Sequence, residues 1–204
     1  MDDAHQTFAS TPTLSGSRTR LEPLSAAHAD ALAEAVAVDE LWRAWYTRIP
    51  SPEGMVAEID RRLALQAEGR LAPWAIIDAD TDRAVGMTTY LNLDPANRRL
   101  EIGSTWLGVG AQRTGINAEA KRLLLARAFE ELRCIAVEFR THWHNHQSRA
   151  AIARLGAKQD GVLRKHSIMD NGTVRDTVVF SITDDEWPTV KVALDARIAR
   201  PRRG

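Results

Sequence analysis

The chain has 204 residues, of which 44% are apolar and 26% charged, which suits one globular domain with a sizeable core. Basic and acidic side chains are equal in number, so the formal net charge is zero, which argues against an extended nucleic-acid-binding surface and against attraction to an anionic membrane. The single cysteine, Cys134, excludes an internal disulfide, and no apolar run approaches the ~18 residues that span a bilayer. The start Met1-Asp2-Asp3 is too acidic for a secretion signal. We therefore expect a cytoplasmic protein.

The first third of the chain predicts a strand followed by two helices. Residues 1–13 are polar, with Ser, Thr and Pro, and are expected to be flexible. A strand is predicted over Leu14–Leu24, and Ser25 is a typical N-cap for an alanine-rich helix over Ala26–Val38. A second helix is predicted from Ser51 to about Glu68, because apolar residues recur there at every fourth position.

The middle of the chain predicts short strands and one long helix. Two strands, Trp74–Ile77 and Ala84–Leu93, flank an aspartate-rich turn and indicate a hairpin. A strand over Arg99–Leu107, a helix over Gly115–Leu132 and a strand over Ile135–Thr141 then follow. This strand–helix–strand order predicts that its two strands are parallel and joined by a right-handed crossover.

The last third predicts a short helix, a hairpin and a final helix. The short helix covers Asn145–Leu155. Asn171-Gly172 is a strong turn signal between two strands, Val162–Met169 and Thr173–Ile182. The final helix begins at about Asp184.

The order of these elements predicts an α+β fold in which helices cover a mixed sheet. No internal repeat and no shift in composition divides the chain. We therefore expect a single domain over residues 14–197, between a flexible N-terminus (1–13) and a basic C-terminal tail (198–204).

The loop between the strand 99–107 and the helix 115–132 has the features of a phosphate-binding site. A helix N-terminus offers unpaired N–H groups and a partial positive charge, Gly115 lets a ligand approach the backbone, and Arg113 adds a cation. Ile116-Asn117 stands where a nucleotide P-loop requires Lys-Ser or Lys-Thr, and G-x-G-x-x-G is absent, so nucleotide loops are excluded. From spacing alone, an ordinary strand–helix turn remains an equal alternative.

The stretch Gln112–Ala118 resembles the Q/R-x-x-G-x-G/A loop of the GNAT acetyltransferase superfamily, with Asn117 at the second glycine of that pattern. Four more segments are similar, in order, to the branch that includes the ribosomal-protein N-terminal acetyltransferases (RimJ/RimL type). They are Leu21-Glu22-Pro23-Leu24, Glu101-Ile102-Gly103, Asn145-His146-Gln147-Ser148 and Arg149–Gly156. The likeness covers about residues 14–183.

This resemblance implies a GNAT-like fold, with a mostly antiparallel mixed sheet of about seven strands, a parallel pair that splays at the acyl-CoA site, and helices on both faces. It implies an acetyl-CoA-dependent N-acetyltransferase that acts on a protein N-terminus or a small-molecule amine, and a homodimer is common among such proteins. The residues that it assigns to acetyl-CoA are Trp106, Leu107, Gln112, Arg113, Thr114, Gly115, Ile116, Asn117, Ala118, Asn145 and Ser148.

Acyl transfer to an amine needs a base for the amine, a donor for the carbonyl oxygen and an acid for the departing thiolate. Glu101 is the candidate base, acting through water, and a solvent-facing glutamate is the alternative. Strand alternation predicts that Gly103 lies beside it and leaves space for a substrate. The two expected faces of this strand are Glu101, Gly103, Thr105 and Leu107 on one side, and Leu100, Ile102, Ser104 and Trp106 on the other.

Ser148 is the candidate acid. It begins an inward stripe of its helix that continues through Ala151, Ile152 and Leu155, so its hydroxyl could reach a thiolate, although a small packing residue is the alternative. Asn145 could contact the pantetheine amides, cap the helix, or do both.

The resemblance implies that Trp42, Trp45 and Tyr46 shape the acceptor pocket, and core packing is the alternative for them. His142 is a further candidate for lining this pocket. His142, His144 and His146 alternate, as metal ligands on a strand would, but the helix start at Asn145 breaks that geometry and no metal site is expected. Two other functions stay open, namely an acyl-CoA-binding regulatory module without turnover and an enzyme that uses another acyl-CoA such as succinyl-CoA.

Overall fold

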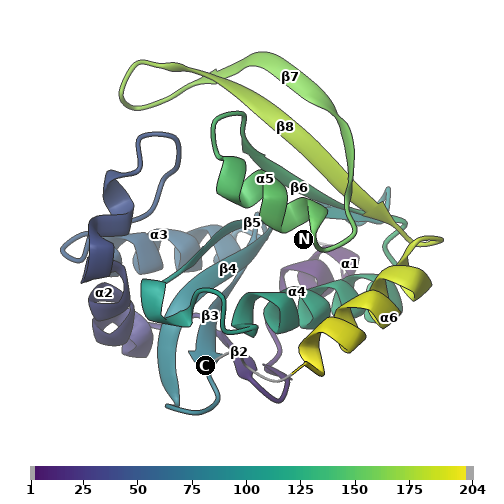
Figure 1. Ribbon diagram of the computed structural model, residues 1–204, viewed down its shortest axis with the longest axis horizontal. Coiled ribbons are helices and arrows are strands. Elements are labelled where there is room, and N and C mark those ends of the chain that lie inside the picture. The colour runs from purple at the N-terminus through teal and green to yellow at the C-terminus, as the bar shows by residue number, and fades with distance from the viewer. Residues whose placement is uncertain (1–2, 201–204) are drawn as a thin grey trace.

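An eight-stranded sheet forms the centre of the molecule, with the strand order β1-β2-β3-β4-β5-β6-β8-β7 (Figure 1). The computed structural model describes residues 3–200. The strands are β1 (Leu14–Ser15), β2 (Thr19–Pro23), β3 (Ala72–Asp78), β4 (Arg83–Asp94), β5 (Arg99–Leu107), β6 (Ala136–His142), β7 (Lys158–Ile168) and β8 (Val174–Thr183). Neighbouring strands are antiparallel except β5 and β6, which are parallel, so the predicted mixed α+β sheet is confirmed.

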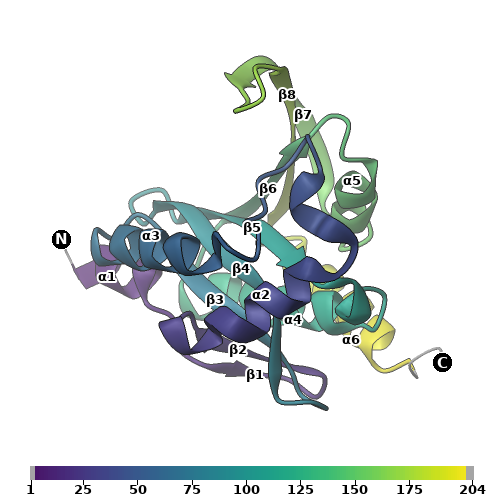
Figure 2. The same cartoon turned by 90° about the vertical axis from the view of Figure 1, so that its left-hand side faces the viewer.

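Helices cover both faces of this sheet (Figures 1 and 2). They are α1 (Asp3–Ala9), α2 (Ala29–Ala37), α3 (Met55–Ala67), α4 (Ile116–Ala126), α5 (His146–Ala153) and α6 (Trp187–Ile198). Shorter 3-10 turns lie at Ala26–His28, Val38–Arg43 and Val109–Ala111, and a π-helical turn at Arg127–Glu131 extends α4. In the part of the chain that is described, no helix is long and apolar enough to cross a membrane.

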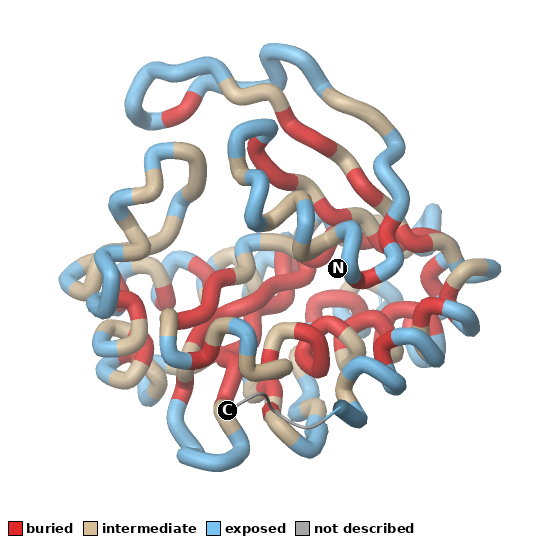
Figure 3. Tube along the Cα trace, in the orientation of Figure 1, coloured by how far each residue is buried: buried red, intermediate tan, exposed pale blue. Residues whose placement is uncertain are grey.

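The core has two parts because the central strands carry apolar residues on both faces. The larger part packs α4 and α6 against one face and includes Tyr90, Leu124 and Phe139. The smaller part packs α2 and α3 against the other face and includes Met87 and Trp106. Figure 3 shows the buried residues along the central strands, whereas β7 is largely exposed and β8 is mostly buried or half-buried.

The N-terminus differs from the flexible segment that the sequence suggested. Residues 3–9 form α1, whose Phe8 is buried in the larger core. Arg127 donates hydrogen bonds to the carbonyl oxygens of Thr7 and Ser10, and Trp74 Nε1 donates to Pro12 O at 2.9 Å. These distant partners explain why polar composition misled the prediction. Of the basic tail, residues 201–204 lie outside the described part of the chain.

A β-bulge in β5 overturns part of the strand-face prediction. Met87 of β4 pairs with Trp106 and Thr89 pairs with Gly103, so two residues of β5 face one of β4, and Ser104 has a φ of 46°. Beyond Gly103 the side chains therefore change face. Leu107 lies in the larger core with Leu100 and Ile102, and Trp106 lies in the smaller core, the reverse of simple alternation.

Candidate active site

The strands β5 and β6 pair over a short distance and then separate. Their parallel ladder joins Arg99–Glu101 to Ala136–Glu138, whereas β5 continues to Leu107 and β6 to His142. Beyond the ladder a gap opens between the two strands, and the backbone groups that face each other across it are not paired with one another. An extended ligand with amide groups could bind there as an added strand.

The loop that follows β5 leads directly to the N-terminus of α4. Gly115 caps this helix with a φ of 94°, which a residue with a side chain adopts only with strain. The N–H groups in the first turn of a helix have no acceptor within the helix, so they can bind an anion. Gln112 Nε2 donates to Leu107 O at 3.0 Å, and Thr114 Oγ1 donates to Ala111 O at 2.7 Å, so the loop is held at both ends.

Arg18 contacts this loop, and the sequence analysis missed it. Its guanidinium donates to the carbonyl oxygens of Thr114 at 3.0 Å and Ile198 at 2.7 Å. A Cβ added to Gly115 would lie 2.8 Å from Arg18 Nη1. Gly115 is therefore needed for packing against Arg18 as well as for its backbone conformation, and Arg18 fastens the loop to the end of α6.

Two predicted contact residues carry buried polar atoms without a partner. Asn117 Oδ1 and Trp106 Nε1 are both buried and make no hydrogen bond to any described residue. Buried polar groups are normally paired, so an unpaired acceptor and an unpaired donor beside this loop and strand suit a ligand that has both amide N–H and C=O groups. Arg113, by contrast, is exposed, with a φ of 65°.

Glu101 lies where the β5–β6 ladder ends, and only 7% of it is exposed. Asn92 Nδ2 donates to Glu101 Oε2 at 2.7 Å, and Arg140 Nε lies 3.6 Å from the same oxygen. Burial raises the pKa of this carboxyl, although Arg140 and Asn92 oppose the change. A raised pKa makes a carboxylate a better proton acceptor near neutral pH.

The space beside Gly103 is filled, contrary to expectation. A Cβ at Gly103 would lie 2.8 Å from Glu101 Oε1 and 2.9 Å from Leu91 Cδ1. Gly103 therefore leaves room for the Glu101 carboxylate itself, and not for a separate substrate. The missing side chain lets this glutamate fold against its own strand.

Asn145 and Ser148 are joined at the start of α5. Asn145 Oδ1 accepts a hydrogen bond from Ser148 N at 3.0 Å, so Asn145 caps the helix. The Ser148 hydroxyl is half-buried and takes part in none of the hydrogen bonds within residues 3–200. It is therefore free to donate to another group.

An aromatic cluster stands over the end of β6. The Trp45 ring lies 5.3 Å from that of His142 and 5.6 Å from that of His144, and Tyr46 packs edge-on to Trp45 at 5.5 Å. Trp42 lies apart from these rings, against the smaller core. Within residues 3–200, no group of three His, Cys, Asp or Glu side chains could hold a metal ion.

The cluster is tied to the turn of the β7–β8 hairpin. Asn171 Nδ2 donates to Trp45 O at 3.1 Å, and Arg48 forms an ion pair with Asp170 at 2.7 Å. In Figure 1 this turn arches towards the loop between α2 and α3. The loop between α2 and α3 is thus joined to the hairpin turn by these two contacts.

Charged residues on β6 and β8 complete this face, and the sequence analysis missed them. Arg140 pairs with Glu138 at 2.8 Å, and half-buried Arg175 donates from Nε to Thr177 Oγ1 at 2.9 Å. Arg140 and His142 share one face of β6 by strand alternation, and this signal could have identified Arg140.

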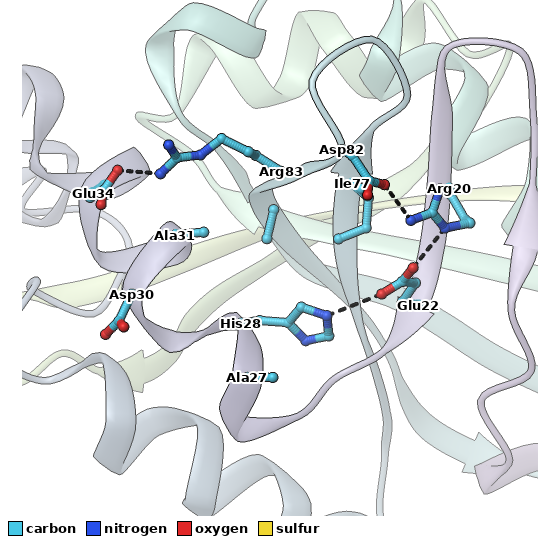
Figure 4. Close-up of a pocket in the computed structure, with 11 residues that line it drawn as sticks. Arg20, Glu22, Ala27, His28, Asp30, Ala31, Glu34, Ile77, Asp82 and Arg83 are labelled. Carbon is cyan, nitrogen blue, oxygen red and sulfur yellow. Dashed lines mark hydrogen bonds and ion pairs between the residues drawn. The ribbon is translucent and has the colours of Figure 1, made fainter.

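One hollow of the surface lies away from these residues. It has a volume of about 460 Å³ and lies between α2 and the β2–β3 edge. Its charges pair with one another, as Arg20 does with Glu22 and Asp82, and Arg83 with Glu34 (Figure 4). None of the predicted site residues lines it.

The arrangement as a whole can bind an extended, anionic ligand and move a proton beside it. The gap between β5 and β6 suits the extended part, the start of α4 suits an anion, and Glu101 lies where the gap begins. Ser148 offers a hydroxyl without a partner, and the Trp45 ring covers the His142 ring at the end of β6.

The chain is similar to known acetyltransferases. A family model described as "Acetyltransferase (GNAT) domain" matches residues 18–158. YdaF of Bacillus subtilis (strain 168), provisionally named a ribosomal N-acetyltransferase, is 36% identical over 102 residues, which cover 50% of this chain and 55% of YdaF. The match thus spans about half the length of that relative.

Two solved structures share the fold. A GCN5-related N-acetyltransferase from Brucella melitensis is 31% identical with a TM-score of 0.84, and the match covers 93% of this chain and 86% of that chain. Mycobacterium smegmatis RimJ in complex with CoA-disulfide is 22% identical with a TM-score of 0.79, over 93% of this chain and 96% of that chain.

Proposed function

Because the chain belongs to the GNAT acetyltransferase family and is an N-acyltransferase, we propose that it transfers an acetyl group from acetyl-CoA to a primary amine. The observation that carries this proposal is the gap between β5 and β6, which opens at Glu101 and leads to the N-terminus of α4. One extended thioester ligand would use both features at once.

The pantetheine arm of acetyl-CoA would extend along the unpaired edge of β5, with backbone contacts at Trp106 and Leu107. Its diphosphate would lie at the start of α4, with N–H groups and side chains from Gln112, Arg113, Thr114, Gly115, Ile116, Asn117 and Ala118. The unpaired Asn117 Oδ1 and Trp106 Nε1 support this assignment, because each could pair with a polar group of the ligand.

Glu101 would act as the general base, directly or through one water. The amine nitrogen forms a bond to the acyl carbon, the C–S bond breaks, and the proton lost by the amine passes to Glu101. Ser148 would donate a proton to the departing thiolate, and Asn145 keeps Ser148 in place through the helix cap. The buried, hydrogen-bonded position of Glu101 supports this role over that of a solvent-facing glutamate.

The experiment is to measure free thiol released from acetyl-CoA in the presence of a panel of amines, together with calorimetric binding of CoA. We expect CoA binding and amine-dependent thiol release. CoA binding without release on any amine would favour a regulatory module instead. Faster release from succinyl-CoA than from acetyl-CoA would change the assigned acyl donor but not the reaction.

A further inference from the structure

A cation without an ion pair lies on β8. Arg175 is half-buried, and its Nε donates to Thr177 Oγ1 at 2.9 Å. Within residues 3–200, its guanidinium forms no ion pair with a carboxylate, whereas its arginine neighbours do. Those neighbours are Arg48 with Asp170, Arg140 with Glu138, and Arg164 with Asp176. Arg175 therefore has donors available for an anion from outside the chain.

A second unpaired donor lies on the neighbouring strand. His142 is only 3% exposed, and its Nδ1 accepts a hydrogen bond from His144 N at 3.1 Å. In the neutral ring the proton is then on Nε2, and this buried atom has no partner among the described residues. Burial first, and the charge of Arg175 second, lower the pKa of His142, which favours this neutral form.

The two donors lie close together. His142 pairs with Thr177 in the β6–β8 ladder, and Arg175 donates to the hydroxyl of that same Thr177. The charge of Arg175 contributes to the lowered pKa of His142. Burial lowers the pKa of Arg175, and the charge of Glu101 opposes that change, so the three groups are close enough to interact electrostatically. Trp45 encloses this space through its contact with the His142 ring.

We propose that Arg175 and His142 Nε2 bind a carboxylate of the acceptor, so that the acceptor is a small amine that also carries a carboxylate. This inference rests on the proposed acetyl transfer, with the amine at Glu101. Glu101 pairs with Glu138, four residues before His142 on β6, which corresponds to ~13 Å along the strand at ~3.3 Å per residue. The side chains shorten this span, so an acceptor with several bonds between amine and carboxylate fits it.

The test uses matched pairs of acceptors. Straight-chain ω-amino acids of increasing length and the common α-amino acids are each compared with their own carboxamide, and kcat/KM is measured by thiol release from acetyl-CoA. We expect the best acid to exceed its carboxamide by at least about tenfold, equivalent to about 1.4 kcal/mol. Arg175→Gln should lower this ratio towards one, and Arg175→Lys should restore part of it.

Arg164→Gln is the matched control, because Arg164 is an exposed arginine of the same hairpin that pairs with Asp176. It should leave the ratio of acid to carboxamide unchanged. The anion site alone would be overturned if carboxamides were acetylated as well as the acids. It would also be overturned if Arg175→Gln had the same ratio of acid to carboxamide kcat/KM as the unaltered protein. Absence of acetylation on every amine would overturn the proposed function and this inference together.

Discussion

The ammonium group of Lys121 lies 2.6 Å from the Thr105 hydroxyl, underneath the bulge of β5. Its other hydrogen bond is to Thr88 Oγ1 at 3.1 Å, and no carboxylate of residues 3–200 forms an ion pair with it. Lys121 is only 5% exposed, and burial lowers its pKa to about 7. Helix α4, which begins at the proposed phosphate site, is thereby joined to the strand that would hold the acyl group.

Replacing Lys121 with Met should change how stability depends on pH. The folded-state pKa of about 7 is below the ordinary value of 10.5, so between these two values the unfolded chain binds more protons than the folded chain. The contribution of Lys121 to the free energy of unfolding therefore rises with pH through this window, by at most about 5 kcal/mol at about 1.36 kcal/mol per pKa unit.

Urea unfolding gives the free energy of unfolding of both proteins at several pH values. The difference between the two proteins isolates the contribution of Lys121, because other titrating groups such as Cys134 contribute equally to both. We expect Lys121→Met to gain stability relative to the unaltered protein at about pH 7, and to lose that gain as the pH rises. Lys158→Met, at an exposed lysine paired with Glu186, is the control. A constant difference across the window would mean that Lys121 is not desolvated in the folded protein.

Replacing Glu101 with Gln should slow acetyl transfer by about 10²–10⁴-fold, the usual contribution of a general base. In the unaltered protein the rate should fall as the pH decreases through the Glu101 pKa, which burial raises above 4.5, because only the carboxylate accepts a proton. This acid limb should disappear in the variant. Measuring kcat/KM against pH, with CoA affinity as a control for binding, checks both effects.

Glu138→Gln is the companion variant, since Glu138 pairs with Glu101 in the ladder but is bonded to Arg99 and Arg140. It should keep the acid limb of the pH profile. A profile that is the same in Glu101→Gln and in the unaltered protein would remove Glu101 as the base.

Gly115→Ala should weaken CoA binding by at least about tenfold. The substitution strains a residue whose φ is 94°, at a typical cost of about 1–3 kcal/mol, and pushes against Arg18. Gly110→Ala, in the same loop, is the control, because a Cβ there meets nothing within 4 Å. The double variant Arg18→Ala/Gly115→Ala separates the contact from the backbone strain. Equal affinities for the two glycine variants would exclude the loop from the CoA site.

The sequence predicted the element order well because each helix and strand has a local signal. The alternating strands and the turn at Asn171-Gly172 lie in short segments, and the family resemblance was confirmed by the match over residues 18–158. These features depend on neighbours in the chain, so they can be read without the fold.

Features that depend on distant partners could not be read in this way. The bulge at Ser104 shifts the faces of β5, but nothing in Gly103-Ser104-Thr105 marks it. Arg18 reaches Thr114 across 96 positions, and it is this contact that fills the space at Gly115. Arg175 and His142 are brought together only by the β6–β8 ladder. Alternation finds the face of a strand, but not which strand lies beside it.

Variants of Asn145 and Ser148 should distinguish the effect of the helix cap on stability from the effect of the proposed acid on the rate. Asn145→Ala removes the side-chain acceptor of Ser148 N and should lower the free energy of unfolding by about 1 kcal/mol, the usual value of an N-cap. Ser148→Ala keeps that backbone N–H and loses only a hydroxyl without a partner, so stability should stay within about 0.5 kcal/mol while the rate of thiol release falls. Urea unfolding and initial rates on the same two variants decide the matter. An unaltered rate in Ser148→Ala would show that the thiolate obtains its proton from another source, such as solvent.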